Sequence, residues 1–417
     1  MTSMENKKRY KATKAGRIPE EWQALPLSKL INRLETGVSV VGENRSARIG
    51  EKGVLKVSSV SYGVFNPEEI KIVSDENIER LKTAPKKGSI LISRANTPDL
   101  VGATAFVYET YDNVYLPDKI WQTVFKKEIE VDPLYVFFSL KGDRNKYKIS
   151  NLATGSSGSM KNISKPSFLS LYIPLPPLPE QQKIATILST WDKAIDSMTA
   201  LIDAKEEQKK GLMQRLLTGK VRLKGFIENW TETSLGHHFK LNTEKVIHEI
   251  DLPVFTSSHK GLMLQSEYYD TSRITNKTIV GNNVLPPKYF TYRSRSDSGF
   301  FKFNRNDTSY CGCISKYYPV FIPKGSDSQF MFFFLNYFSS RFRAFASGTS
   351  QLVLSFNQFC KVKFKIPSPS EQHEIGVLLN VMENTIILLK QRKEQLELER
   401  KGLMQQLLTG KTRVKLN

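Results

Sequence analysis

The chain has 417 residues, which indicates two or three domains, and a formal net charge of +20 from 61 Lys and Arg against 41 Asp and Glu. This basic excess favours a polyanionic partner, and a hydrophobic fraction of 40% excludes predominant disorder. Three Cys exclude a disulfide scaffold and fit a reducing cytoplasm. The polar N-terminus has no signal-peptide core, and the longest apolar run (330–335) is too short to span a bilayer.

An internal repeat divides the chain. KGLMQRLLTGK at 210–220 recurs as KGLMQQLLTGK at 401–411, an offset of 191 residues, and ten of the eleven positions are identical. Weaker matches between the preceding segments follow in the same order, which indicates a duplication. The predicted parts are an N-terminal tail (1–15), a first globular domain (16–178), a first helix (179–224), a second globular domain (225–368) and a second helix (369–417).

The first domain alternates short β-rich runs with turns and then contains one aromatic-rich helix. The runs at 54–60, 89–93, 101–107 and 121–125 predict strands. Asp132 followed by Pro133 predicts the start of the helix, with Asp as its N-cap and Pro at its first position. This mixture predicts an α+β domain, whose strand order does not follow from the sequence.

The first long helix and its copy carry apolar residues in alternating steps of four and three, the seam of a coiled coil. Pro179 opens the first helix, Ser370 is the predicted N-cap of the second, and Gly219 and Gly410 mark their ends. The seam includes Ile184, Leu188, Trp191, Ile195, Leu212 and Leu216, and in the copy Ile375, Leu379, Met382, Ile386, Leu403 and Leu407.

One amphipathic helix cannot cover its own apolar stripe, but two can cover each other's. The simplest arrangement is an antiparallel pair that holds the two domains at a fixed separation. The alternative is that each helix packs only against its own domain. The predicted fold class is therefore two similar α+β domains separated by two long helices packed as an antiparallel coiled coil, with internal pseudo-twofold symmetry.

The second domain repeats the pattern of the first. Predicted strands lie at 254–257, 289–292, 299–303 and 317–322, and a second aromatic-rich helix begins at Asp327. The basic surplus lies mainly in the two globular domains, so a polyanion would contact both.

Catalytic motifs are absent. Gly410-Lys411-Thr412 ends like a phosphate-binding loop, but position 405 is Gln and no helix follows. No Asn-Pro-Pro-Tyr or Asp-Pro-Pro-Tyr tetrapeptide of an adenine methyltransferase is present. Cys311-x-Cys313 is a weak metal motif and is better read as buried structural thiols. We expect no catalytic residue and no metal site.

The segments that open the two helices carry a family resemblance. IPLPPLPEQQKIATIL (173–188), FKIPSPSEQHEIGVLL (364–379) and the two GLMQ-x-LLTGK helix ends resemble specificity subunits of type I restriction–modification enzymes. The resemblance implies that each domain is a target-recognition domain for one half of a split DNA sequence. It also implies that the helix pair fixes the gap between the halves.

The resemblance further implies partners and cofactors. Two modification subunits would dock on the helices and methylate adenine N6 with S-adenosylmethionine, and motor-nuclease subunits using ATP and Mg would cleave unmethylated DNA. The chain itself would be a non-catalytic, cytoplasmic subunit of a prokaryotic host-defence complex and would bind no cofactor.

DNA contacts require Lys, Arg, hydroxyls or free backbone N–H groups for phosphates, and side chains that reach base edges. The candidates follow predicted strands or lie in two glycine loops. In the first domain they are Lys86, Lys87, Arg94, Asn96, Ser156, Ser157 and Lys161, and in the second Tyr292, Arg293, Arg295, Lys302, Arg305, Thr349 and Ser350.

Two other readings remain open. A stand-alone bipartite DNA-binding regulator would bind its site tightly without partners. A coiled-coil adaptor with no nucleic-acid role is disfavoured by the basic charge of both domains.

Overall fold

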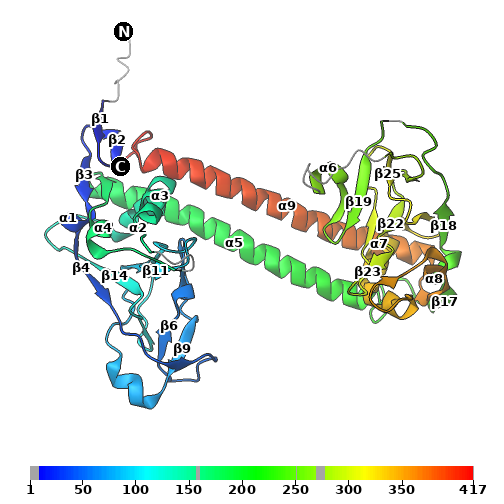
Figure 1. The fold of residues 1–417 in the computed structure, drawn as a ribbon, viewed down its shortest axis with the longest axis horizontal. Helices are drawn as coiled ribbons and strands as arrows, with labels where there is room; N and C mark the ends of the chain where they lie inside the picture. Colours follow the sequence, from blue (N-terminus) through cyan, green and yellow to red (C-terminus); the bar gives the residue numbers. More distant parts are fainter. Residues whose placement is uncertain (1–8, 156–159, 250, 269–277, 417) are drawn as a thin grey trace, which may run out of the picture. The chain divides into compact units, whose positions relative to one another are not determined.

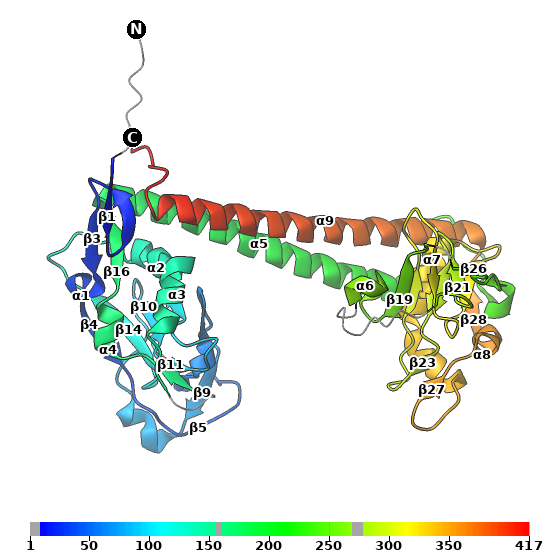
Figure 2. The same cartoon turned by 45° about the horizontal axis from the view of Figure 1, so that its top comes forward.

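The computed structural model describes residues 9–155, 160–249, 251–268 and 278–416. It divides into two compact units, Met1–Ser197 with Lys393–Asn417, and Met198–Arg392. The long helices α5 (Leu178–Leu216) and α9 (Pro369–Leu407) each run from one unit into the other (Figures 1 and 2). Each unit therefore contains one globular domain, the beginning of one long helix and the end of the other.

The first unit is built on a four-stranded antiparallel sheet in the order β12 (Thr104–Phe106), β10 (Ile90–Ser93), β14 (Ile120–Phe125) and β4 (Ile31–Thr36). A second sheet has the order β13 (Val114–Tyr115), β6 (Gly53–Leu55), β9 (Ile70–Val73) and β5 (Gly42–Glu43). Short pairs add β1 (Tyr10–Thr13) with β2 (Gly16–Pro19), β3 (Gln23–Pro26) with β16 (Tyr172–Leu175), β7 (Val60–Ser61) with β8 (Val64–Phe65), and β11 (Ala95–Asn96) with β15 (Lys161–Asn162). The helices are α1 (Leu27–Leu30), α2 (Pro133–Lys141), α3 (Asp143–Asn151) and α4 (Lys165–Leu169).

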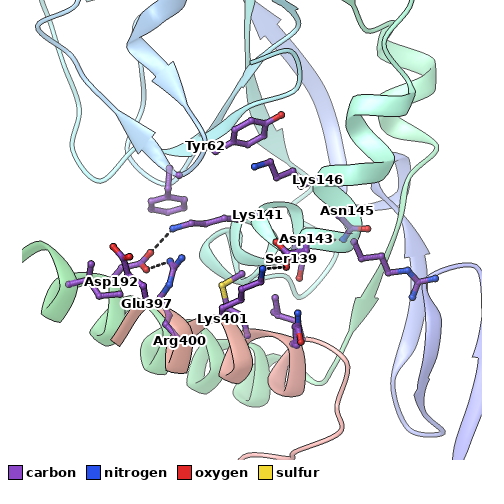
Figure 3. Close-up of a pocket in the computed structure, with 18 of the residues that line it drawn as sticks. Tyr62, Ser139, Lys141, Asp143, Asn145, Lys146, Asp192, Glu397, Arg400 and Lys401 are labelled. Carbon is purple, nitrogen blue, oxygen red and sulfur yellow. Dashed lines mark hydrogen bonds and ion pairs between the residues drawn. The ribbon is translucent and has the colours of Figure 1, made fainter. Parts of the chain in front are cut away.

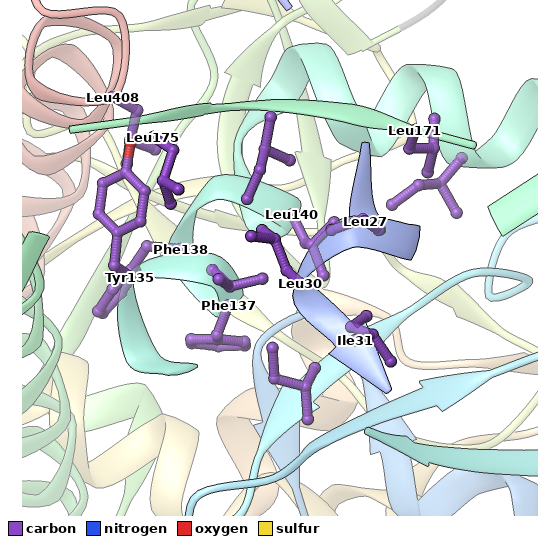
Figure 4. Packing of buried hydrophobic residues seen from close by; sticks show 14 of the residues in the cluster. Leu27, Leu30, Ile31, Tyr135, Phe137, Phe138, Leu140, Leu171, Leu175 and Leu408 are labelled. Carbon is purple, nitrogen blue, oxygen red and sulfur yellow. The ribbon is translucent and has the colours of Figure 1, made fainter. Parts of the chain in front are cut away.

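Helix α2 is the centre of the first core (Figure 4). Its Asp132 N-cap accepts a 2.8 Å hydrogen bond from Tyr135 N, as predicted from Asp132-Pro133. The α2 side chains Phe137 and Phe138 are almost fully buried, and Leu408, which follows α9, packs into the same cluster. The core of the first domain therefore includes a residue from the segment that follows α9.

The second unit repeats the main sheet with β24 (Phe303–Arg305), β22 (Phe290–Tyr292), β26 (Val320–Pro323) and β18 (Phe239–Asn242). Its other sheet has the order β20 (Gly261–Leu264), β19 (Val254–Ser258), β25 (Gly312–Ile314) and β21 (Asn283–Leu285). The pairs β17 (Thr231–Ser234) with β28 (Lys363–Ile366) and β23 (Arg295–Ser296) with β27 (Leu352–Val353) match β3–β16 and β11–β15. The helices are α6 (Gln265–Tyr268), α7 (Ser328–Tyr337) and α8 (Phe356–Lys361).

The second predicted cap is also confirmed, because Asp327 accepts from Phe330 N at the start of α7. The strand predicted at 299–303 is largely wrong, since β24 begins only at Phe303. Gly299 has a φ of +77° and its N–H donates to Ser296 Oγ, which makes this segment a turn.

The predicted helix seam is buried. None of its residues on α5 or α9 is exposed. In the first unit Arg400 of α9 contacts Asp192 of α5, and in the second Lys209 of α5 contacts Glu383 of α9. Early positions of one helix therefore face late positions of the other, and the predicted antiparallel packing is confirmed within each unit.

The predicted N-cap of the second helix is wrong by two residues. Helix α9 begins at Pro369, and Ser368 accepts through its carbonyl from Gln372 N. Pro favours the first helical position because its missing N–H is not needed there, so the preceding Ser takes the cap.

Each helix start is clamped by the segment that follows the other helix. In the first unit Glu180 accepts from Arg413 at 2.7 and 2.8 Å and from Trp22 Nε1 at 3.1 Å. In the second unit Glu371 accepts in the same way from Arg222, twice at 2.6 Å, and from Trp230 Nε1 at 3.1 Å. The duplication therefore extends to buried ion pairs that tie the ends of the two helices together.

Candidate nucleic-acid interface

Each domain carries a two-stranded ribbon directly after the second strand of its main sheet. β11 follows β10 and pairs with β15, with Asn96 opposite Lys161. β23 follows β22 and pairs with β27, with Arg295 opposite Val353. The ribbons are equivalent, because Ile163 N donates to Arg94 O in the first and Leu354 N to Ser294 O in the second.

A glycine loop leads into the second strand of each ribbon. Gly155 has a φ of +148° and Gly348 a φ of +116°, a region that residues with a side chain rarely adopt. A Cβ at Gly348 would lie 2.3 Å from Gln351 O, and at Gly155 2.8 Å from Met160 O. Both loops therefore require glycine. Thr349 and Ser350 are exposed, whereas Ser156 and Ser157 lie outside the described residues.

The side chain of Arg94 forms hydrogen bonds within the first domain. Its Nε donates to Asp118 O at 2.8 Å and its Nη1 to Asn162 Oδ1 at 3.2 Å. In the second domain the equivalent Ser294 donates to Tyr317 O at 2.8 Å. Both side chains therefore bind the carbonyl of a neighbouring loop, and Arg94 is partly committed to this contact.

Asn96 and Lys161 are brought together on the first ribbon, as cross-strand neighbours. Asn96 donates to Ser93 Oγ and accepts from Thr97 N, and Lys161 Nζ lies 3.4 Å from Gly155 O. Lys86 and Lys87 precede β10, whereas the ribbon follows it, so they lie at the opposite end of that strand. Both are exposed, and Lys86 lies 3.6 Å from Glu35.

The second ribbon has the more open cationic surface. Arg293 and Arg295 are exposed, and the Arg295 guanidinium stacks 5.7 Å from the centroid of Tyr317. Lys316 Nζ lies 5.4 Å from the same ring, which is 62% exposed. Cations around an exposed aromatic ring suit phosphates and bases. The sequence does not single out Lys316 and Tyr317 as candidates, because its pattern predicts a strand over 317–322, whereas β26 begins only at Val320.

Three candidates of the second domain lie in or against its interior rather than on an open surface. Tyr292 is fully buried and donates to Leu354 O, and burial raises the pKa of its hydroxyl. The Arg305 side chain is 7% exposed and bonds Asp307 and Gln329. Lys302 faces the long helices, where burial and the nearby Lys209 lower its pKa. All three residues of β22 are buried, so this strand offers no open face at Tyr292.

The helix candidates lie in the domain cores or in the seam. Ile184, Leu188 and Leu407 belong to the first core, and Leu216, Ile375 and Leu379 to the second. Leu403 and Leu212 pack against these cores, Ile386 is buried, and Trp191, Ile195 and Met382 are half-buried.

Within the described part of the chain, no group of three or more His, Cys, Asp or Glu residues could hold a metal ion. Cys313 is fully buried and Cys311 half-buried, and burial raises the pKa of both thiols. Among the described helices, none has the length and apolar character needed to cross a bilayer.

Two similar α+β domains, equivalent polar ribbons and a shared pair of long helices define a duplicated recognition protein. The family model described as "Type I restriction modification DNA specificity domain" matches residues 19–206 and 228–398. The chain belongs to this family and is a specificity subunit of a type I restriction–modification system, a DNA-recognition component rather than a catalytic one.

Relatives match along nearly the whole chain. The putative type I restriction enzyme MjaX specificity subunit of Methanocaldococcus jannaschii is 24% identical and covers 97% of each chain. The MjaVIII specificity subunit of the same organism is 25% identical over 96% of this chain and 95% of its own. A crystal structure of the type I restriction–modification S subunit from M. genitalium has a TM-score of 0.59 at 15% identity, and covers 100% of this chain and 99% of that chain. This last likeness concerns the fold.

Proposed function

We propose that each globular domain reads one half of a bipartite DNA target through the surface that carries its ribbon. The duplication of the ribbon and its glycine loop in both domains is the observation that supports this proposal. The ribbons differ in side chains, with Asn96 and Lys161 in one and Arg295 in the other. Two ribbons with the same backbone arrangement but different side chains suit two half-sites of different sequence.

The α5–α9 pair sets the gap between the half-sites and provides the docking region for two modification subunits. These subunits supply the S-adenosylmethionine-dependent methylation of adenine N6, and restriction subunits with ATP and Mg cleave unmethylated DNA. The specificity chain contributes recognition and binds no cofactor of its own. This division of labour agrees with membership of the specificity family.

Methylome sequencing of the host with and without the gene tests the proposal. The expected result is a split motif carrying N6-methyladenine in both halves, which disappears when the gene is deleted. An unchanged methylome contradicts it. Tight, specific binding by the purified chain alone, together with an unchanged methylome, would instead identify a stand-alone regulator.

A further inference from the structure

A tight turn lies directly before the second strand of the main sheet in each domain. In the first domain the turn is 86–89, before β10, and Ser89 N donates to Lys86 O at 3.1 Å. In the second domain it is 286–289, before β22, and Tyr289 N donates to Pro286 O at 3.3 Å. Each turn is therefore closed by a hydrogen bond between its first and fourth residues, as in a β-turn.

The two turns are equivalent in position and in hydrogen bonding. Gly88 precedes Arg94 by six residues, and Lys288 precedes Ser294 by six, and those two later residues accept the matched ribbon bonds. The N–H groups of Gly88 and Lys288 each donate to the carbonyl of the residue that follows the neighbouring strand, β12 or β24, at 2.8 and 2.6 Å. Lys288 therefore occupies the place that glycine holds in the first domain.

The third position of this turn has a left-handed backbone. Gly88 has a φ of +82° and Lys288 a φ of +69°. Glycine adopts this region without steric cost, whereas a side chain brings its Cβ too close to the backbone. Among the residues that the structure describes, Lys288 is the one non-glycine residue with a positive φ. A lysine at this position therefore costs stability that a glycine would not.

The side chain of Lys288 is open to solvent and carries a charge that its neighbours leave unbalanced. It is 64% exposed, and its Nζ lies 3.2 Å from Asp307 Oδ1. Both oxygens of the same carboxylate also accept from the buried Arg305, at 2.8 and 3.2 Å. Because Arg305 already balances Asp307, the three groups carry a net charge of +1, and the exposed amine of Lys288 presents it to solvent.

The first unit also contains a carboxylate shared by two cations, but there the cations are enclosed. Lys141 Nζ lies 2.8 Å from Asp192 Oδ2, and Arg400 contacts the other oxygen (Figure 3). The side chains of Lys141 and Arg400 are 15% and 22% exposed, and they join α2 to the long helices. That cluster serves the packing of the first unit, whereas Lys288 faces outward.

We propose that Lys288 binds a backbone phosphate of the DNA half-site that the second domain reads, and that the strained turn is kept for this contact. The turn of the first domain has glycine at its third position and exposed cations at its first two, Lys86 and Lys87. The turn of the second domain has proline at those two positions, so Lys288 is its one cation. Each domain therefore presents a cation before the same strand. This inference rests on the proposed function and adds a phosphate contact to it.

The position of the turn allows Lys288 to contact the same duplex as the ribbon. Lys288 precedes Arg295 by seven positions, which limits the distance between their Cα atoms to about 24 Å. This distance corresponds to at most about seven base-pair steps of DNA. The lysine amine is a compact charge on a flexible stem and lacks the planar fork of arginine, so it suits a phosphate. We therefore expect its contribution to be independent of DNA sequence.

The test measures DNA affinity and thermal stability in the same variants. The full-length chain is assembled with the modification subunits of the same genome, and fluorescence anisotropy follows binding to a duplex with the methylated split motif and to an unrelated duplex. Lys288→Gly should weaken binding to both by at least about threefold and lower the slope of log K against log salt by about 0.9. In calorimetry of the full-length chain it should raise the Tm of the second unit by about 2–4 °C, because glycine relieves the turn.

Two further variants separate charge from backbone strain. Lys288→Arg keeps the charge and the strain, and it should retain the affinity and salt slope of the wild type. Lys240→Ala removes an exposed cation of β18 outside the turn and should also bind like the wild type.

Wild-type affinity and salt slope in Lys288→Gly would overturn the inference, as would an equal loss of binding in Lys288→Arg. A lower Tm in Lys288→Gly would show that the lysine stabilises the turn and would also overturn it. A loss confined to the duplex with the split motif would contradict a phosphate contact. Absence of motif-specific binding by the wild-type complex would instead count against the proposed function, so the two failures are distinguishable.

Discussion

The second ribbon brings Arg295, Tyr317 and Lys316 together on one exposed surface, and both cations stack on the aromatic ring. Such stacking lowers the side-chain freedom that would be lost on binding DNA. Arg305 shows the contrast, because Asp307 and Gln329 already occupy its guanidinium. Arg295, whose guanidinium is not occupied by a carboxylate, is therefore a better candidate for reading DNA than Arg305.

Arg295→Ala should weaken binding of the assembled complex to its target by about 1–3 kcal/mol and relax specificity at one position of one half-site. The reason is the loss of a bidentate base contact on the ribbon. Fluorescence anisotropy with single-base variants of the target measures both effects. Lys240→Ala, the control, removes an exposed cation of β18 outside the ribbon and should leave binding unchanged. Equal weakening on all sequences would identify Arg295 as a phosphate contact.

At the scale of elements, the ribbon depends on its glycine loop. Gly348→Ala places a Cβ 2.3 Å from Gln351 O at a φ of +116°, so the loop must rearrange. We expect severalfold weaker binding to the half-site that Arg295 affects, with the other half-site unchanged, in the same anisotropy assay. Gly261→Ala is the control, since its φ of +129° lies in a similarly disfavoured region but no atom lies within 4 Å of the added Cβ. Similar losses in both variants would refute a specific role of the loop.

The ion pairs Arg413–Glu180 and Arg222–Glu371 clamp the ends of the long helices together. Glu180 and Glu371 are buried, so removal of the partner Arg leaves a buried carboxylate without its cation. Arg413→Ala should destabilise the first unit and Arg222→Ala the second, each by about 3 kcal/mol. Hydrogen exchange locates the effect within the chain.

Arg33→Ala is a suitable control for the clamp variants. Its side chain is 59% exposed and pairs with Glu35 on the surface, so it should cost less than about 1 kcal/mol. Faster exchange in the second unit of Arg413→Ala, or in neither unit, would contradict a local clamp.

At the scale of the whole molecule, the helix pair connects the two domains by two separate chain segments. Removal of one heptad from each helix at facing positions preserves the seam, because the pattern repeats every seven residues. It shortens each helix by about 10 Å, which corresponds to at most ~3 base pairs of DNA. Methylome sequencing should show the same half-sites separated by a shorter gap. The same gap with intact methylation would refute the helix pair as the element that sets it.

The repeat, the two N-capped helices and the seam were predictable because each depends on residues close in sequence. Asp132 and Asp327 cap their helices by accepting a hydrogen bond from the backbone N–H three residues later. The seam follows the helical period. The order of the strands was not predictable, since it depends on pairings between distant segments. The clamp of Glu180 is similar, because its partner Arg413 lies 233 residues further along the chain.

The sequence by itself determined the duplication, the α+β class and the family, since repeated motifs and local periodicity carry that information. Only the tertiary structure decided which cations remain available for DNA. Arg94, Arg295 and Arg305 look alike in the sequence, because each is a cation next to a predicted strand. Arg94 bonds residues 24 and 68 positions away, and Arg305 bonds Ser328 and Gln329 besides the nearby Asp307, whereas Arg295 only stacks on Tyr317 and is the least committed of the three.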